Sequence, residues 1–584
     1  MIINFIKRDI KGFFDIFKNK KELVLLLAMM AFVLVNVVKI TVFNYYLMSD
    51  KTLELFSYKL KFTMLVACIL YPLLFMFRAR MILVLFYALQ TVYILVNSAY
   101  YFYFHNYFHI NESLQVLNEG IAAIKNFSAP LHPAMLLILI DLPILIYIVR
   151  KYKGCPVIVR KTWAIVLSVM ILSACGIAAI EKQNFAEKVS FKQSIKNYYE
   201  GESDIIERYG TLFNNGVNIY NNQDYSYLAN NFVYGETVSA DTSTKRHPNI
   251  IFVQVESLDA NIIEQMHDGQ YVAPYLHALT DNSVYYPYTM SYHLGGSTSD
   301  TEFSVINSVQ PLADYPSIKL ANYDYSNSMV KVLAENAYST YAFHGNVGGF
   351  FNRNRAFPKM GFQQFYDISA MGLTEQGWGA SDGDVFDYTI AKLKEAQKPF
   401  FSYTITMTSH GPFTNAANYY ENPLFDDVSK KRVRNYYNSI AYVDQQLEKF
   451  VGEVRKNFGN TYIIIMGDHT PSIKSGPYTQ AAFAENDRYF EFVPLFVITP
   501  DQKKYKETRM AASFLDIAPT ILNASRIDYE IKSDGLDLLA YPNANRNVPY
   551  LGASYDRYSL YAKVPRTYDE TGSRVASAET KDNH

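Results

Sequence analysis

Cysteine is scarce in this sequence. The chain has only 3 cysteines in 584 residues, and none of them follows Cys175. Cys68 and Cys175 lie in apolar runs, and Cys155 lies between two such runs. The long C-terminal part therefore has neither a disulfide bond nor a thiolate metal site. A domain of that size can bury enough apolar surface to be stable without cross-links, even outside the cell.

An excess of charge of either sign is also lacking. The chain has 54 Lys and Arg residues against 55 Asp and Glu residues, a formal net charge of -1, so no nucleic-acid partner is expected. The length is too great for one ordinary core, which indicates at least two domains. Residues 1–180 are dominated by apolar runs, whereas the rest of the chain is polar and rich in Tyr and Asn.

Five apolar runs are present in the first part of the chain: Leu23–Tyr46, Phe62–Phe77, Met81–Phe104, Met135–Val149 and Trp163–Ile180. A helix that spans a bilayer needs roughly 20 mostly apolar residues. The first and third runs reach that length, and the second and fourth are shorter. Because the runs follow one another with almost no polar face between them, they predict a five-helix transmembrane anchor over residues 1–180.

Basic residues give the orientation of this anchor. They cluster before the first run, between the second and third, and between the fourth and fifth. The positive-inside rule then places the N-terminus in the cytoplasm, and five spans place the C-terminal part outside the cell. Lys39, near the outer end of the first run, is expected to extend its amine toward the interface. Residues 181–247 are interpreted as a stalk or linker.

Residues 248–584 alternate short apolar runs with amphipathic stretches. The predicted strands are Asn249–Val255, Thr340–Phe343, Phe400–Thr406, Thr461–Met466 and Leu495–Ile498. The predicted helices include Glu302–Ser308, Ser326–Asn336, Asp384–Glu395 and Val433–Phe458. This alternation predicts an extracellular α/β domain around a central, largely parallel sheet. Functional sites in such sheets gather at the carboxyl ends of the strands.

Chemically interesting residues do follow predicted strands. Glu256 comes directly after the first strand, and Asp468 and His469 come directly after the strand at Thr461–Met466. A carboxylate beside an imidazole suits a divalent cation. Thr298 follows Gly295-Gly296 at the start of a predicted helix, where backbone N–H groups hold anions. Taken alone, the Asp468-His469 segment is explained equally well by a turn, and the Glu256 and Thr298 segments are explained better by a helix cap or a turn. His293 is interpreted as a surface or packing histidine.

Taken together, these segments resemble the lipoteichoic acid synthase family of the alkaline phosphatase/sulfatase superfamily. The matching segments are Val255-Glu256-Ser257, Gly296 to Phe303, His344-Gly345-Asn346, Phe351-Asn352-Arg353, Ser409 to Phe413 and Gly467 to Pro471. The similarity extends from about Pro248 to Ile527. The five-span anchor fits the same architecture.

The resemblance implies a role for eight residues. Glu256, Thr298, Asp468 and His469 would hold manganese (Mn²⁺) or magnesium (Mg²⁺), with Thr298 as the nucleophile. The substrate would contact His344, Phe351, Arg353 and His410. In this group, Phe351 stands where the family's polymerases tend to have Trp, so the aromatic wall is kept and its N–H donor is lost.

The implied reaction transfers glycerophosphate from phosphatidylglycerol, through a phospho-threonine intermediate, to a glycolipid or a growing polyglycerolphosphate chain. The residues leave open whether the protein is a polymerising synthase or a primase. The alternatives are a phosphoethanolamine transferase of the same superfamily and a non-catalytic membrane sensor or scaffold. Sulfatase activity is disfavoured, because Thr298 is followed by Ser299-Asp300-Thr301 without the Pro and Arg typical of sulfatases. The expected location is the cell membrane.

Overall fold

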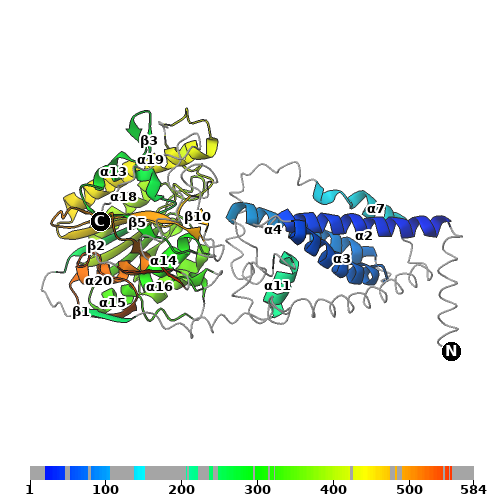
Figure 1. Ribbon diagram of the computed structural model, residues 1–584, viewed down its shortest axis with the longest axis horizontal. Coiled ribbons are helices and arrows are strands. Elements are labelled where there is room, and N and C mark those ends of the chain that lie inside the picture. Colours follow the sequence, from blue (N-terminus) through cyan, green and yellow to red (C-terminus); the bar gives the residue numbers. More distant parts are fainter. Residues whose placement is uncertain are drawn as a thin grey trace, which may run out of the picture. The chain divides into compact units, whose positions relative to one another are not determined.

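The chain forms two compact units, Met1–Leu117 with Phe127–Asp224, and Asn118–Asn126 with Tyr225–His584. The computed structural model describes residues 20–46, 53–76, 80–104, 137–151, 206, 210–220, 236–240, 247–293, 296–312, 316–320, 323–420, 425–471, 473, 481–482, 489–542, 546–550 and 553–555. Each unit is described separately below (Figure 1).

The first unit is helical. Its helices are α2 (Lys20–Tyr46), α3 (Leu53–Met76), α4 (Arg80–Phe104), α7 (Leu142–Lys151) and α11 (Thr211–Tyr220). Of the described helices, α2 and α4 have the length and apolar composition needed to cross a bilayer.

The five predicted spans are met only in part. The second run is the later part of α3, and the fourth includes α7, whose 10 residues are too few to cross a bilayer. The fifth run, Trp163–Ile180, lies outside the described residues. The five-helix anchor therefore stays a prediction.

Lys39 does not extend toward an interface, and that prediction is wrong. The side chain is buried, and its amine lies 2.7 Å from the carboxylate of Asp141, immediately before α7. Asn36 and Tyr87 donate hydrogen bonds of 2.7 Å each to the same carboxylate. A buried ion pair with these extra donors ties α7 to α2 and α4, because an amine without a partner would be costly in an apolar bundle.

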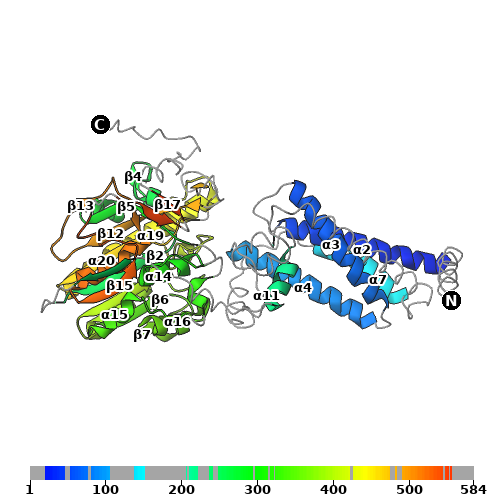
Figure 2. The same cartoon turned by 60° about the horizontal axis from the view of Figure 1, so that its bottom comes forward.

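The second unit is built on a nine-stranded mixed sheet. In spatial order its strands are β13 (Tyr505–Lys506), β5 (Val284–Met290), β12 (Phe492–Ile498), β9 (Thr461–Gly467), β2 (Asn249–Val255), β8 (Phe400–Ile405), β6 (Ser339–His344) and β7 (Gln364–Tyr366), with β14 (Ala512–Ser513) beside β5. In Figure 2 the labelled strands β13, β5, β12, β2, β6 and β7 follow this order from one edge of the sheet to the other. Within this sheet β12 is antiparallel to both of its neighbours and the other pairings are parallel. The predicted parallel character is confirmed, apart from the direction of β12.

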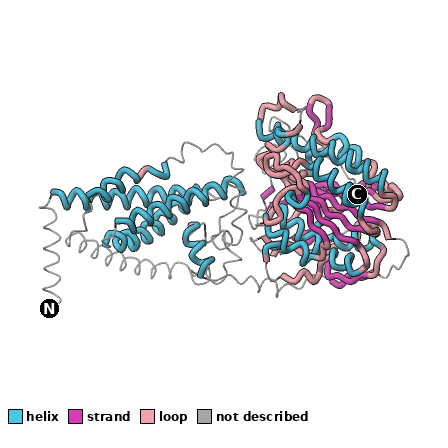
Figure 3. The backbone as a smooth tube through the Cα atoms, turned by 180° about the vertical axis from the view of Figure 1, so that it is seen from behind, coloured by secondary structure: helices cyan, strands magenta, loops and turns pink. Residues whose placement is uncertain are grey.

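Helices cover both faces of this sheet. One face carries α13 (Pro274–Leu279), α18 (Asp382–Glu395) and α19 (Lys431–Asn457), and the other carries α14 (Thr298–Asn307), α15 (Met329–Glu335), α16 (Arg353–Met360) and α20 (Ile517–Ser525) (Figure 1). Figure 3 shows the strands side by side between these layers. Every residue of β2 is buried, since alternate side chains enter the two cores. Because helices cover both faces of the sheet, a functional site is expected in the loops at the carboxyl ends of the parallel strands.

Candidate active site

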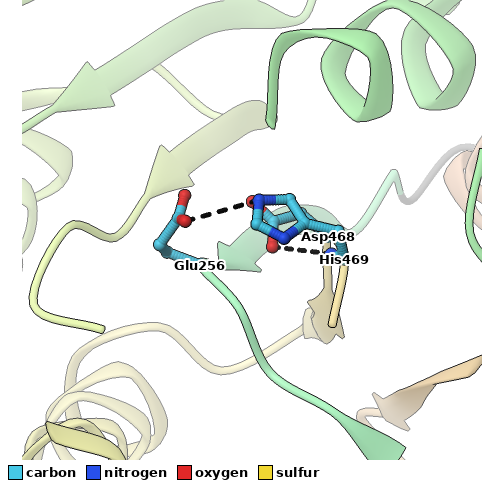
Figure 4. Close-up of side chains that lie close together, drawn as sticks. All are labelled: Glu256, Asp468 and His469. Carbon is cyan, nitrogen blue, oxygen red and sulfur yellow. Dashed lines mark hydrogen bonds and ion pairs between the residues drawn. The ribbon is translucent and has the colours of Figure 1, made fainter. Parts of the chain in front are cut away.

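Two neighbouring strands deliver the central acidic residues. β2 and β9 run parallel, with Val255 opposite Gly467 in the register, so the next residues, Glu256 and Asp468, leave the sheet side by side. Both side chains are buried. His469 follows Asp468 on the same loop, and its Nε2 lies 3.4 Å from Oε1 of Glu256 (Figure 4). The structure thus brings three of the predicted residues together at one edge of the sheet.

Thr298 joins this cluster from helix α14. It is the first residue of α14, and its Oγ1 donates a hydrogen bond of 2.9 Å to Oε2 of Glu256. The same oxygen lies 3.4 Å from Nε2 of His469. A hydroxyl at the start of a helix, close to a carboxylate that accepts its proton, has the arrangement of a nucleophile beside its base.

Backbone contacts fix the orientation of these ligands. Nδ1 of His469 lies 2.9 Å from the carbonyl oxygen of Thr470 and donates to it, so Nε2 faces Glu256 and Thr298. Oδ1 of Asp468 accepts hydrogen bonds of 2.7 Å from the backbone N–H groups of Ser257 and His469. The remaining oxygen of Asp468 lies 3.7 Å from Nε2 of His469.

Burial and charge set the protonation of the cluster. Burial raises the pKa of Asp468 to about 8, and the charge of Glu256 acts in the same direction. Burial also opposes ionisation of Glu256, but His469 and the Thr298 hydroxyl hold its pKa below the usual range. Burial disfavours the charged form of His469, and the two carboxylates outweigh that effect and hold its pKa well above the usual range. Without a bound cation, a proton on the imidazole balances the buried negative charge.

The donor atoms fit a divalent metal ion. One ligand atom each from Glu256, Asp468 and His469 lie within 4.8 Å of one another. Two carboxylates, an imidazole and the nearby Thr298 hydroxyl are donors that Mn²⁺, Mg²⁺ and Zn²⁺ accept. The orientation of Nε2 toward the carboxylates suits coordination, because Nδ1 already has its own acceptor.

The loops that carry these residues are held in uncommon backbone conformations. Ser257 and Ser297, the neighbours of Glu256 and Thr298, have φ angles of 52° and 43°. Gly296 donates a 2.9 Å hydrogen bond to the buried Asp300, and a Cβ at Gly296 would lie 2.3 Å from the Asp300 carboxylate. Left-handed conformations of this kind cost free energy and occur often at functional sites. The turn before Thr298 therefore requires glycine.

His344 and Arg353 form a second buried group. His344 ends β6, and its Nε2 lies 3.2 Å from Nη1 of Arg353 at the start of α16. Nε of Arg353 donates to both oxygens of Glu302, and Nη2 donates to the same carboxylate. The pKa of His344 lies well below its usual range, first because of burial and then because of the Arg353 charge. The guanidinium predicted to bind phosphate is thus engaged by protein acceptors, and it holds His344 in place.

Phe351 and His410 lie beside these groups. The ring of Phe351 lies between two cations, with Lys319 Nζ at 5.2 Å and Arg353 Cζ at 5.3 Å from its centroid. Nδ1 of His410 lies 2.7 Å from the carbonyl oxygen of Gly411, and its ring packs on Trp378 at 5.5 Å. Burial lowers the pKa of His410, which leaves the imidazole neutral with Nε2 unprotonated.

Sequence reasoning missed an ion pair beside the metal ligands. Nε2 of His293 lies 3.0 Å from Glu491, and the His293 and His469 rings are 5.7 Å apart between centroids. Glu491 also accepts a 2.8 Å hydrogen bond from the backbone N–H of Thr470. The pair therefore supports the loop that carries His469. No local signal marks it, because Glu491 is far from His293 in the chain and is followed by an ordinary apolar strand.

Comparisons with known proteins agree with this geometry. The sulfatase family profile matches residues 248–527. Lipoteichoic acid synthase 2 of Bacillus subtilis is 28% identical over 351 residues, which are 57% of this chain and 53% of that protein. The lipoteichoic acid synthase-like protein YvgJ of the same organism is 23% identical over 478 residues, covering 77% of this chain and 76% of that protein. The chain thus spans about half the length of the first of these relatives.

Among solved structures, the lipooligosaccharide phosphoethanolamine transferase EptA of Neisseria meningitidis shares the fold with a TM-score of 0.54 and 15% identity. The likeness covers 87% of this chain and 96% of that one. The three-layer fold, with two acids and a histidine at its strand ends, defines a member of the alkaline phosphatase/sulfatase superfamily. Within this superfamily the chain is similar to lipoteichoic acid synthases.

Proposed function

We propose that this protein is a membrane-anchored phosphotransferase that moves glycerophosphate from phosphatidylglycerol to a glycolipid or to a growing polyglycerolphosphate chain. The observation that carries the proposal is the hydroxyl of Thr298, 2.9 Å from Glu256 and 3.4 Å from His469. The names of the similar lipoteichoic acid synthases support the choice of substrates. The catalytic unit lies outside the cell, held at the membrane where its lipid donor resides.

Four residues hold the proposed metal ion. Glu256, Asp468 and His469 supply two carboxylates and an imidazole, and Thr298 supplies its hydroxyl oxygen. Held by these residues, Mn²⁺ or Mg²⁺ would lower the pKa of the Thr298 hydroxyl and neutralise charge on the transferred phosphate.

In the first half-reaction, Oγ1 of Thr298 attacks the phosphorus of phosphatidylglycerol, and the bond from phosphorus to the diacylglycerol oxygen breaks. Thr298 loses its proton and the departing diacylglycerol oxygen gains one, so the protons balance. In the second half-reaction, an acceptor hydroxyl attacks the glycerophospho-threonine, loses its proton and restores the Thr298 hydroxyl. His344, Phe351, Arg353 and His410 surround the glycerophosphate group, with Arg353 acting through the orientation of His344.

Two alternatives make different predictions. A phosphoethanolamine transferase would use the same nucleophile on phosphatidylethanolamine. EptA supports that reading through the fold alone. A non-catalytic sensor would have no reason to keep Thr298 oriented on Glu256 beside three metal-ligating side chains.

The test measures the release of diacylglycerol from fluorescent phosphatidylglycerol by the purified full-length protein with Mn²⁺. Thr298→Ala is expected to abolish the release, and Asp468→Asn is expected to abolish both the release and Mn²⁺ binding. Thr374→Ala serves as the matched control, because Thr374 is exposed and is not among the residues that form the described site.

Turnover of phosphatidylethanolamine, but not of phosphatidylglycerol, would move the assignment to the first alternative. A folded protein that turns over neither lipid would support the non-catalytic reading.

A further inference from the structure

A cavity lies inside the helical unit, away from the residues discussed so far. Its volume is about 490 Å³, and it is bounded by α2, α3, α4 and α11. Ile40 of α2, Ala67 of α3, Phe86 of α4 and Val217 of α11 contribute to its walls. Pockets that bind small molecules have about this volume, between roughly 300 and 1,000 Å³.

Helix α11 is held over the bundle by specific contacts. Asn44, near the C-terminal end of α2, accepts a hydrogen bond of 3.2 Å from the backbone N–H of Thr211, the first residue of α11. Asn215 donates a hydrogen bond of 2.9 Å to the hydroxyl of Tyr93 on α4. A Cβ at Gly210 would lie 2.8 Å from Asn44, so the chain approaches α2 closely there. Residues of α11 thus form one wall of the cavity.

The chemistry of the walls selects an uncharged, apolar occupant. No Asp, Glu, Lys, Arg or His side chain is among the described residues that line the cavity. Tyr71 and Gln90 line it, but both hydrogen-bond to Asn36 behind the wall. Asn44 is engaged with Thr211. The polar side chains therefore stabilise the wall and leave apolar surface toward the cavity.

The surroundings of the unit indicate where such an occupant comes from. Leu34, Leu85 and Leu89 on α2 and α4 are each 60% or more exposed, as expected for side chains that face lipid. An α-helix is about 10 Å across and rises 5.4 Å per turn, so a volume of this size holds roughly one turn. A helix of a second protein copy therefore does not fit, whereas a flexible hydrocarbon chain does.

We propose that this cavity binds one acyl chain of a membrane glycerophospholipid, the class to which the donor of the proposed function belongs. The inference rests on that proposed function for the membrane setting. The buried pair of Lys39 and Asp141, with its partner Asn36, keeps the base of the site rigid.

Gly216 offers a direct test. It lines the cavity from α11, and a Cβ built at this position meets no atom within 4 Å, so a larger side chain enters open space. Replacement also removes a glycine from a helix interior, which favours the helix. Gly216→Phe is therefore expected to place its ring in the cavity. Gly452→Phe is the matched control, since Gly452 also lies in a helix interior, in α19, with nothing within 4 Å of its Cβ position.

The first measurement is retention of dioleoyl-phosphatidylglycerol by the full-length protein in mild detergent, followed by mass spectrometry of the intact complex. Wild type and Gly452→Phe are expected to retain one lipid, and Gly216→Phe is expected to bind it about tenfold more weakly, as when about two methylene groups lose their burial. Gly216→Leu is expected to give an intermediate loss of lipid affinity. This variant replaces Gly216→Phe in the test if the Phe variant does not fold.

The second measurement is kinetic. Gly216→Phe is expected to raise the KM for the long-chain donor about tenfold, while turnover of a short-chain, water-dispersed phosphatidylglycerol stays unchanged. Equal lipid retention and equal KM in wild type and folded Gly216 variants would overturn the inference and leave the proposed function standing. Lipid retention that depends on Gly216, in a protein without any transferase activity, would support this inference and contradict the proposed function.

Discussion

The ion pair between Glu302 and Arg353 shows how the site is supported at the level of single residues. Both side chains are almost fully buried, and the guanidinium donates to both carboxylate oxygens. Burial raises the pKa of Glu302, and the Arg353 charge opposes that shift. The two charges depend on each other, because neither has water to replace its partner.

Glu302→Gln is therefore expected to lower the free energy of unfolding by about 3–5 kcal/mol, since the variant leaves a buried guanidinium without its counter-charge. The measurement is the urea midpoint of the second unit in the purified full-length protein. Glu395→Gln is the control, because Glu395 pairs with Lys392 on the surface of α18 and its loss should leave the midpoint unchanged. Equal midpoints for the two variants would contradict the expectation.

Phe351 gives a second prediction at this scale. Its ring lies between Lys319 and Arg353, so Phe351→Ala removes two cation–π contacts and is expected to lower kcat/KM for phosphatidylglycerol about tenfold. Phe351→Trp keeps an aromatic face and is expected to retain activity at or above the wild-type level. The measurement is diacylglycerol release under both substitutions. A Trp variant as impaired as the Ala variant would contradict the proposed role of the ring.

Sequence patterns located the central residues because each follows a strand directly. Glu256 and Asp468 are adjacent in space because β2 and β9 pair in parallel. An apolar run directly before each acid suggests that both acids lie at the carboxyl ends of buried strands. His293 and Glu491 carry no such mark, because their pairing depends on how distant loops fold against each other. The engagement of Arg353 by Glu302 is likewise a matter of helix packing that spacing does not reveal.

At the scale of elements, α13 depends on a residue from another helix. Its own cap position, Ala273, has no side-chain hydrogen bond. The carboxylate of Asp444 on α19 instead accepts hydrogen bonds of 3.0 and 2.8 Å from the backbone N–H groups of Tyr275 and Leu276. Burial raises the pKa of Asp444 to about 7, and the two backbone donors act against that shift.

This shift predicts a pH dependence. The folded pKa of about 7 lies above the ordinary value of 3.8, so between these values the folded chain keeps a proton that the unfolded chain has lost. The contribution of Asp444 to stability therefore falls as the pH rises through that window. Asp444→Asn lacks this dependence. The urea midpoint of the variant, measured relative to that of the wild type, should therefore increase from about pH 4 to about pH 7. A constant difference between the two proteins would contradict the prediction.

Two helix ends offer a matched pair of glycines. Gly361 ends α16 with φ of 104°, and a Cβ there would lie 2.7 Å from the backbone nitrogen of Lys331. Gly372 ends α17 (Ile368–Met371) with φ of 67° and has nothing within 4 Å. Gly361→Ala is expected to cost about 2–5 kcal/mol through strain and overlap, and Gly372→Ala about 1–2 kcal/mol through strain alone. Comparison of the urea midpoints of the two variants decides this, and a larger loss at Gly372 would contradict it.

Strand prediction succeeded where the strands are mostly apolar and almost wholly buried. β2 matches the predicted Asn249–Val255, and β9 and β8 differ from their predicted ranges by one residue. β5 was not predicted, because Tyr residues and Pro287 interrupt its pattern and proline is uncommon inside a strand. The reversed direction of β12 was also missed, since an apolar run looks the same in either direction.

At the scale of the whole molecule, the stability of the second unit is expected not to depend on redox conditions. No cysteine follows Cys175, so the second unit is stabilised by its two cores, its hydrogen bonds and its ion pairs, without a disulfide bond. Excess dithiothreitol is expected to leave its thermal midpoint unchanged, measured by the near-ultraviolet signal of the full-length protein. A clear drop in the midpoint would show that a covalent link contributes.

The central position of β2 has a consequence for biosynthesis. It precedes the other strands of its sheet in the chain, yet its neighbours are β8 and β9, and the hydrogen bond from Ser257 to Asp468 joins residues 211 positions apart. At about 5–20 residues per second, a ribosome needs roughly 10–40 s to add that length. A nascent chain therefore carries Thr298 long before Asp468 and His469 exist. Truncated or stalled products that end before Asp468 would lack two of the three side chains of the candidate metal site and would therefore be inert.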